Sequence, residues 1–275
     1  MNKYYKKPTF RRAGMIILLG LVLAAESAAQ VNTEAMRREN LEPGYHIDLG
    51  GNVGYTDGNS SLFQNRSNLR LDYVQEEVQF FLVANYRLSR KDKTLFINKG
   101  FTHMRRIKPL RTALYAETFI QKEFNDFIQL NDRELIGVGV RIKWNELERF
   151  SAVHSKLTLN TGLGVMWEQE SIDTGSDGSQ GDPIHGSLAS LIRSTNYIVV
   201  GWIPNELLAI QTTAYFQVDT HRIKDYRILT QTTMKIAISE RLTVNFDINM
   251  RYDSEPPGSI EAFDIDFTNG FSYAI

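Results

Sequence analysis

The chain of 275 residues contains no cysteine, so it has neither a disulfide framework nor a thiolate metal site. It has no run of about 18 or more apolar residues, which argues against a membrane-spanning helix. Neither sign of charge dominates, since 31 Lys and Arg stand against 32 Asp and Glu. This balance argues against a nucleic-acid partner, which would need a basic surface.

What the sequence has instead is alternation of apolar and polar residues, running almost unbroken from Tyr45 to Ile275. Between Arg241 and Asp253 every second residue is apolar: Leu242, Val244, Phe246, Ile248, Met250 and Tyr252. Successive side chains of a strand point to opposite faces, so one face is apolar and the other polar. A closed barrel can turn the apolar face to lipid and the polar face to a wet lumen. The pattern predicts an all-β protein, a single antiparallel up-and-down transmembrane β-barrel.

Alternation and turn residues together predict about 12 strands. We expect them at 45–55, 62–74, 77–88, 93–105, 111–124, 132–144, 156–168, 187–200, 207–219, 225–239, 241–253 and 263–275. Strands of about 11–14 residues are long enough to cross a bilayer at a tilt. The even-numbered connections are mostly short, for example 107–110, whereas the odd ones are longer, for example 169–186. Outer-membrane barrels show this asymmetry between periplasmic turns and external loops.

The N-terminus has the pattern of a secretory signal peptide at 1–29. A basic stretch precedes the apolar run from Ala13 to Ala25, and Ser27 and Ala29 are the small residues of a cut before Gln30. A membrane anchor is the alternative, and Arg11-Arg12 fits a twin-arginine signal poorly. Residues 30–44 are polar without a clear period, and we interpret them as a short periplasmic lead to the barrel at 45–275.

The last strand carries Phe267, Phe271, Tyr273 and Ile275 at period two. Outer-membrane barrels commonly end in an amphipathic strand with an aromatic last residue, which the assembly machinery of that membrane binds. Ile275 replaces the aromatic residue, so the match is partial. We therefore expect the assembly machinery and membrane lipid as partners.

Several local patterns resemble the salt-induced outer membrane protein family of Gram-negative bacteria, a domain of unknown function. They are Gly54-Tyr-Thr-Asp-Gly-Asn-Ser60, Asp132-Arg133 with Gly137-Val-Gly139 and Trp144, Thr161-Gly-Leu-Gly164, Arg251-Tyr-Asp-Ser-Glu-Pro-Pro257, and Asp264 with Gly270-Phe-Ser-Tyr273. The resemblance covers roughly 45–275. It implies an outer-membrane β-barrel and brings no catalytic or binding residues with it.

Few residues suggest chemistry. His185 and Ser187 could form the nucleophilic pair of a lipid-modifying hydrolase, but no orienting acid stands near them in sequence. His154-Ser155 is a weaker pair, and we expect His103 and His221 at satisfied surface positions. Asp173, Asp177 and Asp182 could bind Ca²⁺, but their spacing is not that of an EF-hand. We predict no catalytic, cofactor-binding or metal residue.

Parity divides the strand residues between the two faces. Val138, Val140, Leu159, Val244, Phe246 and Ile248 are expected to face lipid, and Asn160, Asn245, Asp247 and Asn249 the interior. The alternating glycines at 137, 139, 162 and 164 indicate tight inward packing. Mixed charges share the interior face: Arg70, Asp72, Glu117, Glu123, Arg133, Arg141, Lys156, Arg227, Lys235, Arg251, Asp253, Asp264 and Asp266.

These observations favour a passive pore or structural barrel of the outer membrane, not an enzyme. Small solutes or ions could pass, and the mixed charges predict weak selectivity and a narrowed lumen. Two alternatives stay open: a lipid-modifying hydrolase that uses His185 and Ser187, and a soluble ligand-binding barrel of the periplasm.

Overall fold

A computed structural model describes residues 32–34, 36–38, 41–76, 78–147, 156–172, 188–256 and 260–273. They form one sheet of twelve antiparallel strands, in which each strand pairs with its neighbour in sequence. The strands are β1 (Gly44–Thr56), β2 (Leu62–Gln75), β3 (Val78–Lys91), β4 (Thr94–Arg111), β5 (Leu114–Asn125), β6 (Leu130–Lys143), β7 (Leu157–Ile172), β8 (Leu188–Asn205), β9 (Leu208–Asp219), β10 (Tyr226–Ala237), β11 (Leu242–Asp253) and β12 (Phe263–Tyr273). Two short 3₁₀ helices, η1 (Asp126–Ile128) and η2 (Trp144–Glu146), lie in connections.

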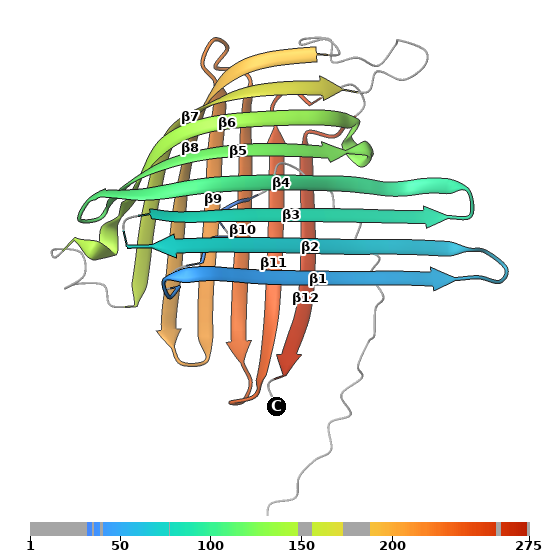
Figure 1. The fold of residues 1–275 in the computed structure, drawn as a ribbon, viewed down its shortest axis with the longest axis horizontal. Coiled ribbons are helices and arrows are strands. Elements are labelled where there is room, and N and C mark those ends of the chain that lie inside the picture. Colours follow the sequence, from blue (N-terminus) through green and yellow to red (C-terminus); the bar gives the residue numbers. More distant parts are fainter. Residues whose placement is uncertain are drawn as a thin grey trace, which may run out of the picture.

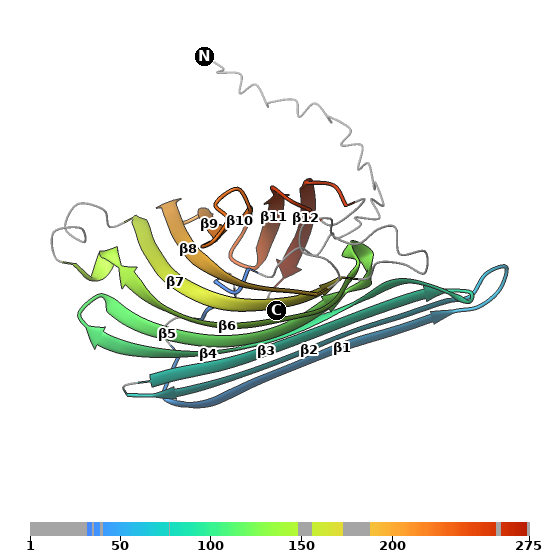
Figure 2. The same ribbon diagram turned by 90° about the horizontal axis from the view of Figure 1, so that it is seen from above.

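The sheet is strongly curved. Figure 1 shows that β1 to β4 run nearly at right angles to β10 to β12, and Figure 2 shows the two ends of the sheet on opposite sides of a concave space. The accumulated right-handed twist of many strands produces this curling. Among the described residues no ladder joins β1 to β12, so closure of the barrel stays a prediction.

All twelve strands lie where the alternation predicts them, but two of the connections do not. β8 continues to Asn205, through most of the expected connection at 201–206. The expected turn at 107–110 is wrong, because β4 continues to Arg111 and Ile107 is a buried strand residue. Pro109 suggested a break, yet it lies beside a register shift, where a strand tolerates proline. The chain instead turns next to Ala113, whose φ of 64° is in the left-handed region.

The convex face of the sheet is apolar, and its side chains are exposed. Leu49, Val138, Leu163 and Phe271 are between 52% and 76% exposed. Aliphatic residues predominate in the middle of the strands of this face, where Phe246 and Phe267 also lie, and many of its aromatic residues lie nearer the two ends. These include Tyr45, Tyr73, Trp202, Phe271 and Tyr273 at one end and Tyr55, Phe216, Tyr226, Tyr252 and Phe263 at the other.

The concave face has the opposite character, because most of its buried side chains are polar or charged. Arg70, Asp72, Glu117, Glu123, Arg133, Arg141, Arg227, Arg251 and Asp253 are all buried, as parity predicts. Lys156, which is expected on the same face, precedes β7 and is exposed. Lys235 lies on β10 in phase with Arg227, but it is exposed too.

Candidate functional site: the charged concave face

A segment from the N-terminal side of β1 lies against the concave face. We call Asn32–Arg38, of which residue 35 is not described, the N-terminal segment. Thr33 and Glu34 are buried, and Met36 packs against the apolar cluster of Phe81, Val83 and Ile107. The described part of the expected periplasmic lead therefore packs within the curve of the sheet.

Glu34 is the centre of the contacts that this segment makes. Its carboxylate accepts a hydrogen bond of 2.6 Å from Arg141 Nη1 and hydrogen bonds of 2.7 and 2.9 Å from Arg37. Arg105 Nη1 also donates to Glu34, and Arg37 and Arg105 both pair with Glu117. We call these five residues the first charge cluster. Buried charges are tolerated when they are paired and hydrogen-bonded in this way.

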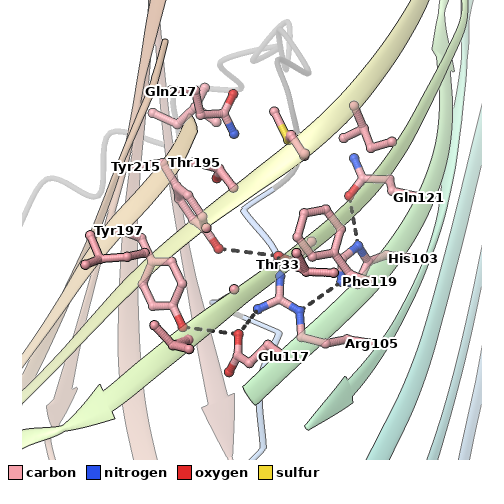
Figure 3. Close-up of a pocket in the computed structure, with 18 residues that line it drawn as sticks. Thr33, His103, Arg105, Glu117, Phe119, Gln121, Thr195, Tyr197, Tyr215 and Gln217 are labelled. Carbon is pink, nitrogen blue, oxygen red and sulfur yellow. Dashed lines mark hydrogen bonds and ion pairs between the residues drawn. The ribbon is translucent and has the colours of Figure 1, made fainter. Parts of the chain in front are cut away.

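Backbone and hydroxyl groups extend this attachment. Arg105 Nη2 donates to Thr33 Oγ1 at 2.7 Å, and the Thr33 hydroxyl lies 3.4 Å from that of Tyr215. Figure 3 shows Thr33 between Arg105 and Tyr215. At the other end of the segment, Arg70 donates to the carbonyl of Met36, and Arg38 pairs with Asp48 at 2.5 Å. The segment thus contacts strands from both halves of the sheet.

A second charge cluster lies closer to the odd-numbered connections. Its members are Glu123, Arg133, Glu168, Glu170, Arg193, Asp225, Arg227, Arg251 and Asp253, all buried. Arg133 stands directly opposite Glu123 on β5 and Glu170 on β7, and pairs with both at 2.6 and 2.8 Å. Such cross-strand pairs stabilise a sheet when opposite charges face each other.

Other pairs of the second cluster join strands that are not neighbours in the sheet. Arg227 of β10 donates to Glu168 of β7 at 2.8 Å and lies 3.2 Å from Glu170. Arg193 of β8 holds Asp225, which precedes β10, through two bonds of 2.7 and 2.8 Å. These contacts bridge the concave space. The space is therefore crossed at two levels, by the N-terminal segment and by the second cluster.

Glycines of β6 and β7 leave room for aromatic rings on the concave face. A Cβ added to Gly137 would lie 2.2 Å from the ring of Phe119, and one added to Gly162 would lie 2.0 Å from the ring of Tyr197. Gly139 and Gly164 face each other across the two strands, and there an added Cβ would meet the opposite backbone at 2.7 Å. The expectation of tight inward packing is confirmed.

The aromatic rings that pack over these glycines, and others near them, hold polar groups in place. The Tyr197 hydroxyl donates to Glu117 at 3.3 Å, and His103 is flanked by Phe119 and Phe81 with ring centroids 5.7 Å apart in each case. Arg105 Nε donates to His103 Nε2 at 3.3 Å, so Nδ1 carries the proton and donates to Gln121 at 2.9 Å. The expected surface position for His103 is wrong, because the side chain is buried; only His221 is exposed.

The other residues singled out in the sequence lie outside the described part of the chain. They are His154, Ser155, Asp173, Asp177, Asp182, His185 and Ser187. Among the described residues no group of three or more His, Asp or Glu side chains is placed to hold a metal ion. No helix in that same part is long and apolar enough to cross a membrane. Sequence reasoning missed the N-terminal segment, because its residues have no period and no motif.

The fold and its two faces define a class, an all-β protein with one up-and-down antiparallel sheet that is apolar outside and charged inside. The family profile described as "Protein of unknown function, DUF481" matches residues 47–275. The chain belongs to this family, which is also known as the salt-induced outer membrane protein family.

Comparison with curated proteins gives no match. Among solved structures, the chain is similar to the NanC porin in its rhombohedral crystal form, with a TM-score of 0.41 and 10% sequence identity. The similarity covers 83% of this chain and 99% of the porin chain.

Proposed function

We propose that the protein is an outer-membrane β-barrel that acts as a passive pore for small solutes and has no catalytic activity. The observation that carries this proposal is the polarity of the sheet. Its exposed convex face has mostly aliphatic residues in the middle and many aromatic residues near both ends, whereas its concave face is polar and charged. Transmembrane barrels have this arrangement, with an apolar band between two aromatic girdles.

A soluble ligand-binding barrel of the periplasm would have the opposite polarity, because a soluble sheet buries its apolar face. Soluble monomers rarely expose contiguous apolar patches of more than a few hundred Å². We expect the protein to stay in the outer-membrane fraction after extraction with urea, which removes peripheral proteins. Its release should need detergent. Recovery in the soluble fraction would contradict the proposal.

Closure of the barrel is part of the same proposal. An edge strand in the hydrocarbon region would leave unpaired N–H and C=O groups, which cost several kcal/mol each. We therefore expect β1 and β12 to pair in the membrane. Since the chain has no cysteine, single cysteines placed along β1 and β12 report this directly. In a closed barrel, cysteines progressively later in β1 should form disulfides with cysteines progressively earlier in β12 of the same chain. Disulfides that form only between two copies of the chain would contradict closure.

The two levels of ion pairs imply a narrow lumen. The buried charges are mixed in sign, so strong selectivity for anions or cations is not expected. Single-channel recording in planar bilayers is the decisive experiment. We expect small, weakly selective currents, and larger ones after deletion of residues 32–38. A folded protein that stays silent after this deletion, and after a second deletion of residues 173–182, would be a structural barrel and not a pore.

A lipid-modifying hydrolase is the competing function. It would use His185 and Ser187, which lie outside the described residues. Hydrolysis of lipid A or phospholipid by the purified protein, lost in Ser187→Ala, would replace the proposed pore by an enzyme.

The assembly machinery of the outer membrane is the proposed partner of β12. The β12 residues Ile265, Phe267, Phe271 and Tyr273 are exposed.

A further inference from the structure

The first charge cluster is unusual because a carboxylate from outside the sheet completes it. Of its four remaining members, Arg105, Glu117 and Arg141 belong to strands, and Arg37 belongs to the N-terminal segment, like Glu34. The strand members carry two positive charges and one negative charge, which leaves the sheet with one positive charge in excess. The Glu34 carboxylate is the group that faces this excess.

The geometry around Glu34 is that of a bound carboxylate. Each of its two oxygens accepts from guanidinium groups: Oε1 from Arg37 and Arg105, and Oε2 from Arg37 and Arg141. Its side chain is only 1% exposed. Planar guanidinium groups in fixed positions match a carboxylate better than an ammonium does. Arg105 is also held by Glu117 and His103 of the concave face, so its position does not depend on the segment alone.

The space beside the cluster is lined by both polar and apolar side chains. A cavity of about 40 Å³ lies next to Thr33 and is bordered by Arg105, Glu117, Tyr197 and Tyr215. One water needs a cavity of about 10–15 Å³, so this space holds only a few waters while the segment is present. Withdrawal of the Thr33 side chain would enlarge it beside Arg105.

We propose that Arg105 and Arg141 form a binding site for the carboxylate of a small solute, and that Glu34 occupies this site as an internal ligand. The proposal rests on the proposed function in that the solute reaches the site through the lumen. An internal ligand joined to its site by a short linker has an effective concentration on the order of millimolar. Carboxylates of modest affinity therefore compete with Glu34 once their own concentration reaches that range. Competition frees the N-terminal segment from the concave face.

The first test uses Glu34→Ala in the full-length protein, refolded in detergent, with propionate as the probe and propionamide as its uncharged control. Binding is measured by saturation-transfer NMR. We expect Glu34→Ala to bind propionate about tenfold more tightly than the unaltered protein, since the internal competitor is gone. Neither protein should bind propionamide measurably. Propionate binding that is no tighter in Glu34→Ala, or equal binding of propionamide, would overturn the proposal.

Two further variants locate the site. Adding Arg141→Gln to Glu34→Ala should weaken propionate binding about tenfold. Adding Lys122→Gln should leave it unchanged, because Lys122 is 60% exposed and pairs only with Asp132 and Glu134 on the convex side. Equal loss in both double variants would point to non-specific attraction and against the site. Inorganic phosphate serves as a second anion, and binding as tight as that of propionate would show a general anion site instead of a carboxylate site.

A separate measurement covers the case in which Glu34→Ala does not fold. A nitroxide attached to Arg38→Cys, whose native side chain is 43% exposed, reports the mobility of the segment without altering Glu34. We expect 100 mM propionate, a concentration about a hundredfold above the millimolar range, to mobilise the label, and propionamide to leave it unchanged. A label that responds to neither would overturn the proposal. Propionate binding without bilayer currents would reject the proposed pore but retain the carboxylate site. Bilayer currents without propionate binding would retain the pore and overturn the site.

Discussion

Glu34 Oε2 accepts a hydrogen bond of 2.6 Å from Arg141 Nη1, although the two residues are 107 positions apart in sequence. This contact joins a segment outside the sheet to the sixth strand, at a point where both side chains are buried. The carboxylate is shielded from bulk solvent there and depends on the guanidinium groups around it. The N-terminal segment is therefore part of the folded core of the concave face.

Arg193 is the residue of the second cluster whose loss should cost most stability. Its side chain is fully buried and pairs with Asp225 and Glu168. In Arg193→Met both carboxylates lose this partner, and removal of one member of a buried pair costs about 3–5 kcal/mol. Arg193→Lys keeps the charge but loses the two parallel bonds to Asp225, so it should cost less. Urea unfolding in lipid vesicles measures the free energy of unfolding.

Lys122→Met is the matched control for this series. Lys122 also pairs with two carboxylates, at 2.7 and 3.0 Å, but its side chain is exposed. Exposed ion pairs contribute little to stability, so the control should lose much less stability than Arg193→Met. If Arg193→Met and Lys122→Met lose equal free energy of unfolding, burial does not determine how much the ion pairs of the second cluster contribute to stability.

Gly137 leaves space for the Phe119 ring, and filling that space should destabilise the sheet. In Gly137→Ala the added methyl would lie 2.2 Å from the ring, which must then leave its place on the strand. Overpacking of this kind costs about 1–3 kcal/mol. In Gly54→Ala the added methyl meets nothing nearer than 4.0 Å, so this variant should unfold at the same urea concentration as the unaltered protein. If the two variants unfold alike, the cost comes from glycine replacement in general and not from the ring.

The strands could be predicted from sequence because each one repeats a single rule, apolar on one face and polar on the other. Residues 241–253 follow this rule throughout, and the structure has β11 at Leu242–Asp253. The turn after β4 could not be predicted, because Ala113 takes the left-handed conformation that normally signals glycine. Pro109, which resembles a turn residue, lies inside the strand.

The candidate site could be predicted only in part. Parity places Glu123, Arg133 and Arg227 on one face, but it does not say which charged residues of that face meet. Arg133 pairs with residues directly opposite in register, whereas Arg227 reaches Glu168 three strands away. That second kind of pairing depends on the curvature of the whole sheet. The docking of Glu34 depends on it as well, and a single short segment without a period gives no signal of its partner.

Val138 tests whether the convex face contacts lipid. It lies in the middle of β6 and is 52% exposed. In Val138→Arg a charge would lie near the bilayer midplane, where it costs about 2–4 kcal/mol, while near the interface it costs about 0–1 kcal/mol. Leu188→Arg, at the exposed start of β8, provides the interfacial control. Unfolding in vesicles should separate the two variants, and equal stability would argue against a membrane at this face.

The last prediction concerns acid. Burial alone would raise the pKa of the Glu34 carboxyl, but Arg37, Arg105 and Arg141 outweigh it and hold the pKa below its ordinary value. Among the other groups of the site, Glu117 shares Arg37 and Arg105, and His103 contacts Arg105. A free glutamate has a pKa of about 4.3. Because docking lowers the pKa, its contribution is fully present above that pH and is lost as the pH falls towards the lowered value.

We therefore expect the nitroxide at Arg38→Cys to stay immobile from neutral pH down to about pH 5, above the ordinary range of glutamate, and to become mobile only in stronger acid. With Glu34→Gln added, the label should be mobile at every pH, since an amide cannot replace the charge that three arginines surround. Mobilisation of the unaltered segment with a midpoint near pH 6.5, the ordinary pKa of histidine, would contradict this account. It would indicate that a group other than Glu34 controls whether the segment stays on the concave face.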